Sequence, residues 1–174
     1  MALNLEDKKQ VVSEVAAVAA DAYSAIAAEY RGLGVEELTE LRTKARQGGV
    51  YVRVVKNTLA KRALEGTDFE CMSDGLTGPL LLAFSQEDPG SAARVIKDFS
   101  EDHDLLKVKM LSISGQVLEP SELKRLASLP TKEQALSMMM AVMKAPIEKF
   151  VRTLNEPHAK MVRTVAAIRD QKQA

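Results

Sequence analysis

Three cations and an amide side chain stand close together where a strand is expected to lead into a helix. The β-branched run Val50–Val55 is followed by Lys56 and Asn57, and Lys61 and Arg62 come one helical turn later. We expect these cations near the positive end of the helix, where a bound phosphate would relieve their repulsion. Clustered Lys and Arg with a few amide groups are also what proteins use to read folded RNA by its shape. The pattern indicates an RNA-binding surface; the alternative is a solvated face whose cations pair with nearby acids.

Charges are segregated along the chain, although 24 Lys and Arg balance 24 Asp and Glu. Residues 42–62 include seven cations and no acid, whereas residues 65–104 include ten acids and two cations. Such asymmetry indicates one anion-facing surface and an opposite, acidic and solvated one. A protein that reads duplex DNA would normally place a helix with base-contacting side chains in the major groove, and few such side chains are present here.

Side chains suited to catalysis or metal binding are few. The two histidines, His103 and His158, form no recognisable motif with the single cysteine, Cys71. His103 lies in an acidic turn, but acids in such turns are usually only solvated, and a metal site would need a second cluster of ligands. The glycine patterns of dinucleotide and phosphate loops are absent. We therefore expect no enzyme activity, no metal and no cofactor.

An apolar stripe near the C-terminus repeats every eleven residues. Residues 146–154 and 157–165 share Pro, Lys, Val, Arg and Thr in register, and a looser copy rich in Met lies eleven residues upstream. Eleven residues make about three helical turns, so equivalent side chains return to nearly the same face. Most surface helices bury such a stripe on their own domain. The recurrence of basic residues at fixed places instead favours a row of equivalent docking sites for copies of a partner.

Proline interrupts the C-terminal pattern twice. A proline inside a helix removes a backbone hydrogen bond and costs about 3 kcal/mol. We therefore expect a kink at Pro157, or a helix that ends and restarts there with Asn155 as its cap. Pro146 would do the same one repeat earlier. The tail would then be segmented, with one unit for each docked partner.

Helix and strand patterns alternate before this tail. They predict an α/β (α+β) domain, residues 1–130, with a mixed sheet flanked by helices, and then an extended C-terminal helical tail, residues 131–174. Asn4 is expected to cap the first helix. The expected helices lie at 4–18, 35–47, from 57 onward, 91–99 and 121–128, and the expected strands at 25–27, 50–55, 80–84, 108–113 and 116–118.

Composition is that of an ordinary soluble protein, with 174 residues of which 46% are hydrophobic and 28% charged. A single cysteine suits a reducing compartment. The acids near the N-terminus argue against a signal peptide, and the lack of about 18 consecutive apolar residues argues against a transmembrane span. A tail that bound a membrane surface would favour more aromatic residues. We expect a cytoplasmic protein without a membrane partner.

Five segments resemble bacterial large-subunit ribosomal protein L-ten, the family that forms the base of the ribosomal stalk. They are the start at 1–5, the turn at 30–32, the run Val-Val-Lys-Asn-Thr-Leu-Ala-Lys-Arg-Ala-Leu at 54–64, the strand at 78–80 and the tail at 162–170. The similarity covers essentially the whole chain. The Lys-Asn-Thr-Leu segment is fairly specific, and the repeated tail strengthens it.

The resemblance implies that residues 1–130 bind large-subunit rRNA beside ribosomal protein L-eleven. It also implies that residues 131–174 carry two or three dimers of the stalk protein L-seven/L-twelve, which recruit translational GTPases. The alternative is a non-ribosomal nucleic-acid-binding protein with a self-packing helical tail. By position, the RNA-binding residues would be Lys8, Lys9, Arg31, Arg53, Lys56, Asn57, Lys61 and Arg62. The partner-binding residues would be Phe150, Val151, Leu154, Met161, Val162, Val165 and Ile168, with Met139, Met140 and Met143 as an additional site.

Overall fold

The computed structural model describes residues 4–103 and 105–173. Residues 1–3, which belong to the segment that resembles the L-ten start, and Asp104, which belongs to the acidic stretch, lie outside the described residues, as does Ala174. The chain divides into two compact units, Met1–Thr131 and Lys132–Ala174.

A five-stranded sheet with the order β2-β3-β1-β4-β5 forms the centre of the first unit. All of its pairings are antiparallel. β1 and β2 are therefore parallel to each other but separated by β3, and β3 and β4 are separated by β1 in the same way, which makes two interlocked split β-α-β units. The strands are β1 (Ser24–Glu29), β2 (Val50–Val54), β3 (Leu80–Ser85), β4 (Lys107–Ile113) and β5 (Gln116–Leu118).

The α/β fold class and the helical tail are confirmed, but the expected mixed sheet is wrong. Alternating helices and strands usually make successive parallel strands neighbours. Here another strand lies between the two parallel strands of each pair, so all neighbouring strands are antiparallel. The hairpin partner expected at 116–118 is confirmed as β5.

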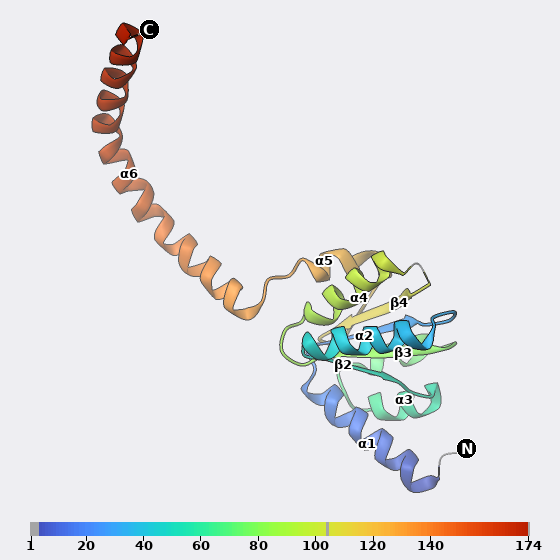
Figure 1. Ribbon diagram of the computed structural model, residues 1–174. Helices are drawn as coiled ribbons and strands as arrows, with labels where there is room; N and C mark the ends of the chain where they lie inside the picture. The colour runs from blue at the N-terminus through green and yellow to red at the C-terminus, as the bar shows by residue number, and fades with distance from the viewer. Residues whose placement is uncertain (1–3, 104, 174) are drawn as a thin grey trace. The chain divides into compact units, whose positions relative to one another are not determined.

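Helices cover both faces of the sheet (Figure 1). One face packs on α1 (Leu5–Asp21) and α3 (Asn57–Leu64), and the other on α2 (Val35–Gln47), α4 (Ser91–Asp102) and α5 (Leu123–Ala127). Side chains alternate between the two cores because successive residues of a strand point to opposite faces. In β3, Leu80, Leu82 and Phe84 enter the first core, and Leu81 and Ala83 enter the second.

Local signals set the ends of the first helices. The Asn4 side chain accepts a hydrogen bond from the amide of Leu5 at 2.8 Å, and the Asp7 carboxylate accepts one from the amide of Asn4 at 3.2 Å, so the predicted cap is confirmed. α2 ends before Gly48, and Gly49 takes a φ of 65° that favours glycine. A short 3-10 helix, Glu70–Gly75, was not predicted, because its buried Met72 is too isolated to form a periodic pattern.

The second unit is one helix, α6 (Lys132–Gln173), with Pro146 and Pro157 inside it. Of the two outcomes predicted at Pro157, a kink or a restart capped by Asn155, the restart does not occur, because α6 continues as one helix through both prolines. The helix bends instead: its axis changes direction between the orange and the red part in Figure 1. A bend moves the proline ring away from the carbonyl four residues earlier. Since the prolines are eleven residues apart, they lie on nearly the same side of the helix.

Candidate functional site

One end of the sheet brings four chain segments together. Glu29, the last residue of β1, is paired with Leu80 at the start of β3 and with Lys107 at the start of β4. Val54, the last residue of β2, pairs with Leu81. The loops at this end carry Tyr30, Arg31, Lys56, Gly78 and Pro79, and Asn57 begins α3 there.

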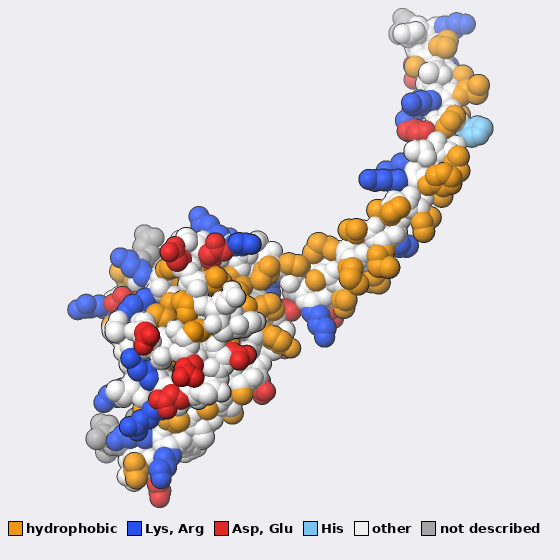
Figure 2. All heavy atoms as spheres, turned by 180° about the vertical axis from the view of Figure 1, so that it is seen from behind, with side chains coloured by type: hydrophobic (Ala, Val, Ile, Leu, Met, Phe, Trp, Pro, Cys, Tyr) orange, Lys and Arg blue, Asp and Glu red, His pale blue; other side chains and the backbone are white. Residues whose placement is uncertain are grey.

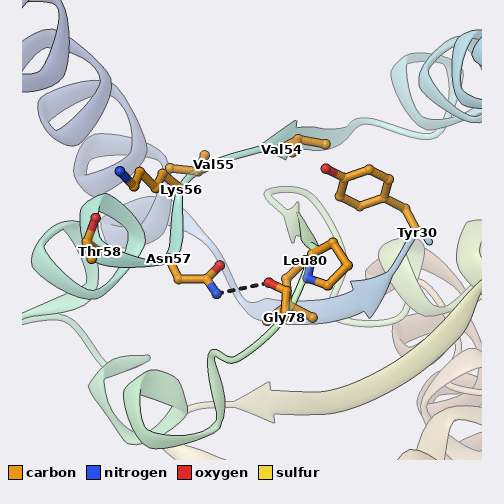
Figure 3. A pocket seen from close by; sticks show the side chains of 9 residues that line it. Tyr30, Val54, Val55, Lys56, Asn57, Thr58, Gly78 and Leu80 are labelled. Atoms are coloured by element: carbon orange, nitrogen blue, oxygen red, sulfur yellow. Dashed lines mark hydrogen bonds between the residues drawn. The ribbon is translucent and has the colours of Figure 1, made fainter. Parts of the chain in front are cut away.

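A pocket of about 350 Å³ opens between these loops (Figure 3). The Asn57 side-chain nitrogen Nδ2 donates a hydrogen bond to the Gly78 carbonyl at 2.9 Å and so ties the start of α3 to the loop before β3. The Tyr30 amide donates to the Pro79 carbonyl at 3.4 Å. The pocket is lined by Tyr30, Val54, Val55, Lys56, Asn57, Thr58, Gly78, Pro79 and Leu80.

Two of the predicted RNA-binding cations, Arg31 and Lys56, lie at this end of the sheet and are exposed. Lys107, which was not predicted, joins them: with Glu29, Arg31 and Leu105 it lines a smaller hollow of about 180 Å³. The sequence places Lys107 directly before the expected strand 108–113, which could have marked it as a loop cation. Only the strand order, however, shows that this strand begins beside Glu29. Figure 2 shows Lys and Arg side chains gathered along the left edge of the globular unit.

Lys61 and Arg62 lie in the last turn of α3, which has only eight residues. The expectation that they sit near the positive end of the helix is therefore wrong, and at the negative end the helix dipole favours them. Of the three cations, only Lys56 lies at the N-terminal end of α3, directly before its first turn. None of these three side chains forms an ion pair with a carboxylate within the described ranges.

Arg53 is held by groups of the same unit. Its guanidinium donates hydrogen bonds to the carboxylate of Glu14 in α1 and, at 3.0 Å, to the hydroxyl of Tyr51. These bonds, the one to Glu14 foremost, raise the pKa of Arg53. The alternative interpretation, that the cations pair with nearby acids, thus holds for this residue. Lys8 and Lys9 are exposed on α1, the helix that shares a core with α3.

Replacing Glu14 with Gln is expected to remove a pH-dependent part of the stability. The hydrogen bond from Arg53 lowers the pKa of Glu14 below its ordinary value of 4.5. A lowered carboxyl pKa stabilises the fold above the unfolded pKa, and that contribution is lost as the pH falls through the folded one. The pair is exposed, so the effect is small and salt-sensitive. Urea unfolding at neutral pH and below pH 4.5 should show that acid lowers the free energy of unfolding more in the wild type than in Glu14→Gln.

Asp98→Asn serves as the matched control, since Asp98 is an exposed carboxylate in the middle of α4, without an ion pair in the part of the chain that the structure describes. It should behave as the wild type does. Identical acid sensitivity in the wild type and Glu14→Gln would show that the pair with Arg53 does not persist in solution.

The predicted partner-binding side chains all project from α6 into solvent. Their exposed fractions run from 53% at Ile168 to 70% at Met161. Figure 2 shows hydrophobic side chains along nearly the whole of the helix. We call this set the α6 stripe: Met139, Met140, Met143, Phe150, Val151, Leu154, Met161, Val162, Val165 and Ile168.

Ile147 was missed in the prediction because its equivalent in the next copy is polar, His158, although the upstream copy has Leu136 at the same place. It is 68% exposed, and with Val151 it forms the apolar wall of a shallow groove of about 420 Å³ on α6. Glu148, Arg152 and Asn155 form the polar wall. The groove therefore extends the α6 stripe towards the polar side of the helix.

His103 contacts side chains of α4 and α2. Its ring stacks on Phe99 with 4.3 Å between ring centres, and its Nδ1 lies 3.4 Å from the Glu37 carboxylate. Within residues 4–103 and 105–173, no three His, Cys, Asp or Glu side chains are grouped so that they could hold a metal ion. Over the same residues, no helix has the length and apolar character needed to cross a bilayer.

Two family models match the chain in succession. The model described as Ribosomal protein L10 matches residues 3–101, and that of the Ribosomal protein uL10 C-terminal region matches residues 129–174. Relatives named "Large ribosomal subunit protein uL10" span the full length. The one from Thioalkalivibrio sulfidiphilus is 70% identical and covers 100% of this chain and 99% of its own.

Other relatives with that name agree. The protein of Methylococcus capsulatus is 70% identical over 100% of this chain and 99% of its own, and that of Legionella pneumophila is 54% identical over 99% of this chain and 97% of its own. The resemblance read from the Lys-Asn-Thr-Leu segment and the repeated tail is therefore confirmed. The chain belongs to the ribosomal protein L10 family.

Proposed function

We propose that this chain binds large-subunit rRNA through the basic end of its sheet and carries dimers of the stalk protein L-seven/L-twelve on α6. Membership of the ribosomal protein L10 family makes it a structural constituent of the large ribosomal subunit and not an enzyme. The observation that carries the proposal is the α6 stripe, which is repeated along one helix and exposed over its whole length. Ribosomal protein L-eleven is the proposed neighbour on the subunit, from the family resemblance alone.

The basic end of the sheet supports the proposal for rRNA. Arg31, Lys56 and Lys107 come from three different loops or strands, so their charges are spread over a surface rather than along one helix. Folded RNA presents phosphates in such three-dimensional patterns. Lys61, Arg62, Lys8 and Lys9 extend the surface along α3 and α1. Arg53 is already held by Glu14, and we assign it the role of fixing β2 to α1 rather than contacting RNA.

Repetition in the α6 stripe supports the proposal for the stalk dimers. An amphipathic helix binds partners by laying its apolar side chains into a groove. Successive copies of the repeat are separated by eleven residues, which is roughly 16 Å along a helix. Each copy offers three equivalent apolar positions, as in Phe150, Val151 and Leu154. Two copies make two dimer sites, and the Met139, Met140 and Met143 copy makes a third.

Native mass spectrometry of the chain with excess L-seven/L-twelve tests this function. The expected complex has one copy of the chain and four or six copies of the stalk protein. Leu154→Asn places an amide in the middle of one repeat, where docking would leave it buried without a partner. We therefore expect this variant to lose one dimer.

Ala159→Asn is the matched control, because it adds the same amide five residues later, outside the α6 stripe. It should keep the wild-type number of copies. The docking proposal is contradicted if Leu154→Asn binds as many dimers, and as tightly, as Ala159→Asn does.

A further inference from the structure

The pocket at the basic end of the sheet combines an aromatic ring, an amide and a cation around one hollow. Tyr30, Val54 and Pro79 supply apolar walls, and Val54 is 37% exposed although it ends a strand. Asn57 and Lys56 supply the polar groups. Its volume of about 350 Å³ falls within the range of about 300–1,000 Å³ that is usual for sites that bind small organic groups.

The hydrogen bond between Asn57 and Gly78 fixes the direction of the Asn57 amide. A carbonyl only accepts hydrogen bonds, so the Asn57 group at 2.9 Å from it must be the Nδ2 donor. The Oδ1 atom is then the free end, and it accepts no hydrogen bond from a side chain or backbone group of the described residues. Figure 3 shows the Tyr30 ring across the hollow from this amide, with its hydroxyl directed inward. A planar group lying against the ring would meet this acceptor with its edge.

The charge around the pocket is positive. Lys56 is exposed at its rim, and Arg31 follows Tyr30 directly. Among the described residues, no carboxylate lines the pocket itself; Glu29 lines the neighbouring hollow, together with Arg31 and Lys107. The pocket therefore favours a ligand with a neutral planar part and an attached anion.

We propose that this pocket receives one unpaired nucleobase of the bound RNA, stacked on Tyr30, with its phosphate beside Lys56. The inference deepens the proposed rRNA binding and rests on it. A paired base is stacked in its helix, whereas bases in loops and bulges are free to stack on aromatic side chains. Asn57 Oδ1 accepts a hydrogen bond from the base, which favours one with an exocyclic amino group.

Abasic substitution in a fragment of large-subunit rRNA tests whether the pocket binds a base. Each unpaired nucleotide of the fragment is replaced in turn by an abasic one, and the affinity of the full-length chain is measured by filter binding. One abasic position is expected to weaken binding by the wild type about tenfold, the usual size of a base-aromatic stacking loss. Tyr30→Ala should bind the intact fragment about tenfold more weakly, and the same abasic position should cost it nothing further.

Tyr30→Phe is the matched control, because it keeps the ring and loses only the hydroxyl; it should respond to the abasic position as the wild type does. Thermal unfolding checks that each variant is folded. If Tyr30→Ala does not fold, Val54→Gln, at an exposed strand end, fills the hollow instead and should produce the same loss.

The outcomes separate the pocket from the function on which it rests. Suppose that the wild type binds the fragment, but every abasic position lowers the affinity of the wild type and of Tyr30→Ala by the same factor. The pocket proposal is then overturned, and rRNA binding stands. If the wild type does not bind the fragment, both proposals are overturned. If Tyr30→Ala and Tyr30→Phe lose the same affinity, the stacking role of the ring is overturned.

Discussion

A chain that ends at Thr131 is expected to lose all binding of L-seven/L-twelve dimers and to keep its affinity for rRNA. Every residue of the α6 stripe lies in the second unit, whereas both hydrophobic cores and the basic end of the sheet lie in the first. An end at Thr131 keeps the Leu129 carbonyl within the chain, where it accepts a hydrogen bond from Arg94 Nη1 at 3.0 Å and anchors the end of the first unit. The shortened chain should also be more soluble, since exposed apolar stripes promote association.

Native mass spectrometry with excess stalk protein measures the loss of dimer binding, and filter binding to the rRNA fragment measures the retained affinity for rRNA. A chain that ends at Asp170 keeps the whole α6 stripe and serves as the control for shortening. Stalk dimers on the Thr131 chain would place docking on the first unit. Equal solubility of the two chains would argue that the stripe is covered in solution.

Neutralising the basic end of the sheet should produce the second large effect. Arg31→Gln combined with Lys56→Gln removes two exposed cations without adding bulk. A hydrogen bond to a charged group contributes about 1.5–3 kcal/mol, so the double variant should bind rRNA roughly a hundredfold more weakly at low salt. The slope of log affinity against log salt should become shallower by about 2, one for each lost phosphate contact.

Lys124→Gln combined with Lys172→Gln makes the same change in net charge at exposed cations of α5 and α6. This control should change the slope far less. Equal effects of the two double variants would mean that net charge, and not the basic end of the sheet, governs binding.

Much of the secondary structure follows from local signals in the sequence. Asn4, Gly34 and the glycines at 48 and 49 bound the first two helices, and α2 has the predicted ends, Val35 and Gln47. Leu80 to Phe84 is a continuous apolar run, as expected for a strand buried on both faces. These features depend on residues close together in the chain, so periodicity and caps are enough to predict them.

Strand order and charge pairing were beyond such signals. The insertion of β3 between β1 and β2 depends on contacts between distant segments, and so does the pairing of Arg53 with Glu14, 39 residues apart. The position of Lys107 beside Arg31 follows from that order. The end of α3, in contrast, could have been predicted from a local signal. Gly66, with a φ of 78°, follows the last turn of the helix, so Lys61 lies near its negative end.

The continuity of α6 through both prolines has a consequence for how its partners act. A break at Asn155 would have been a hinge, and the separation between neighbouring dimers would then have varied. If stalk dimers dock on α6 as proposed, one continuous helix, although bent, would keep successive dimers at a fixed interval of roughly 16 Å along its axis. Tethering at such short range would give a factor released by one dimer a high effective concentration at the next. On the proposed function, the eleven-residue repeat would therefore turn several weak encounters into sustained local capture.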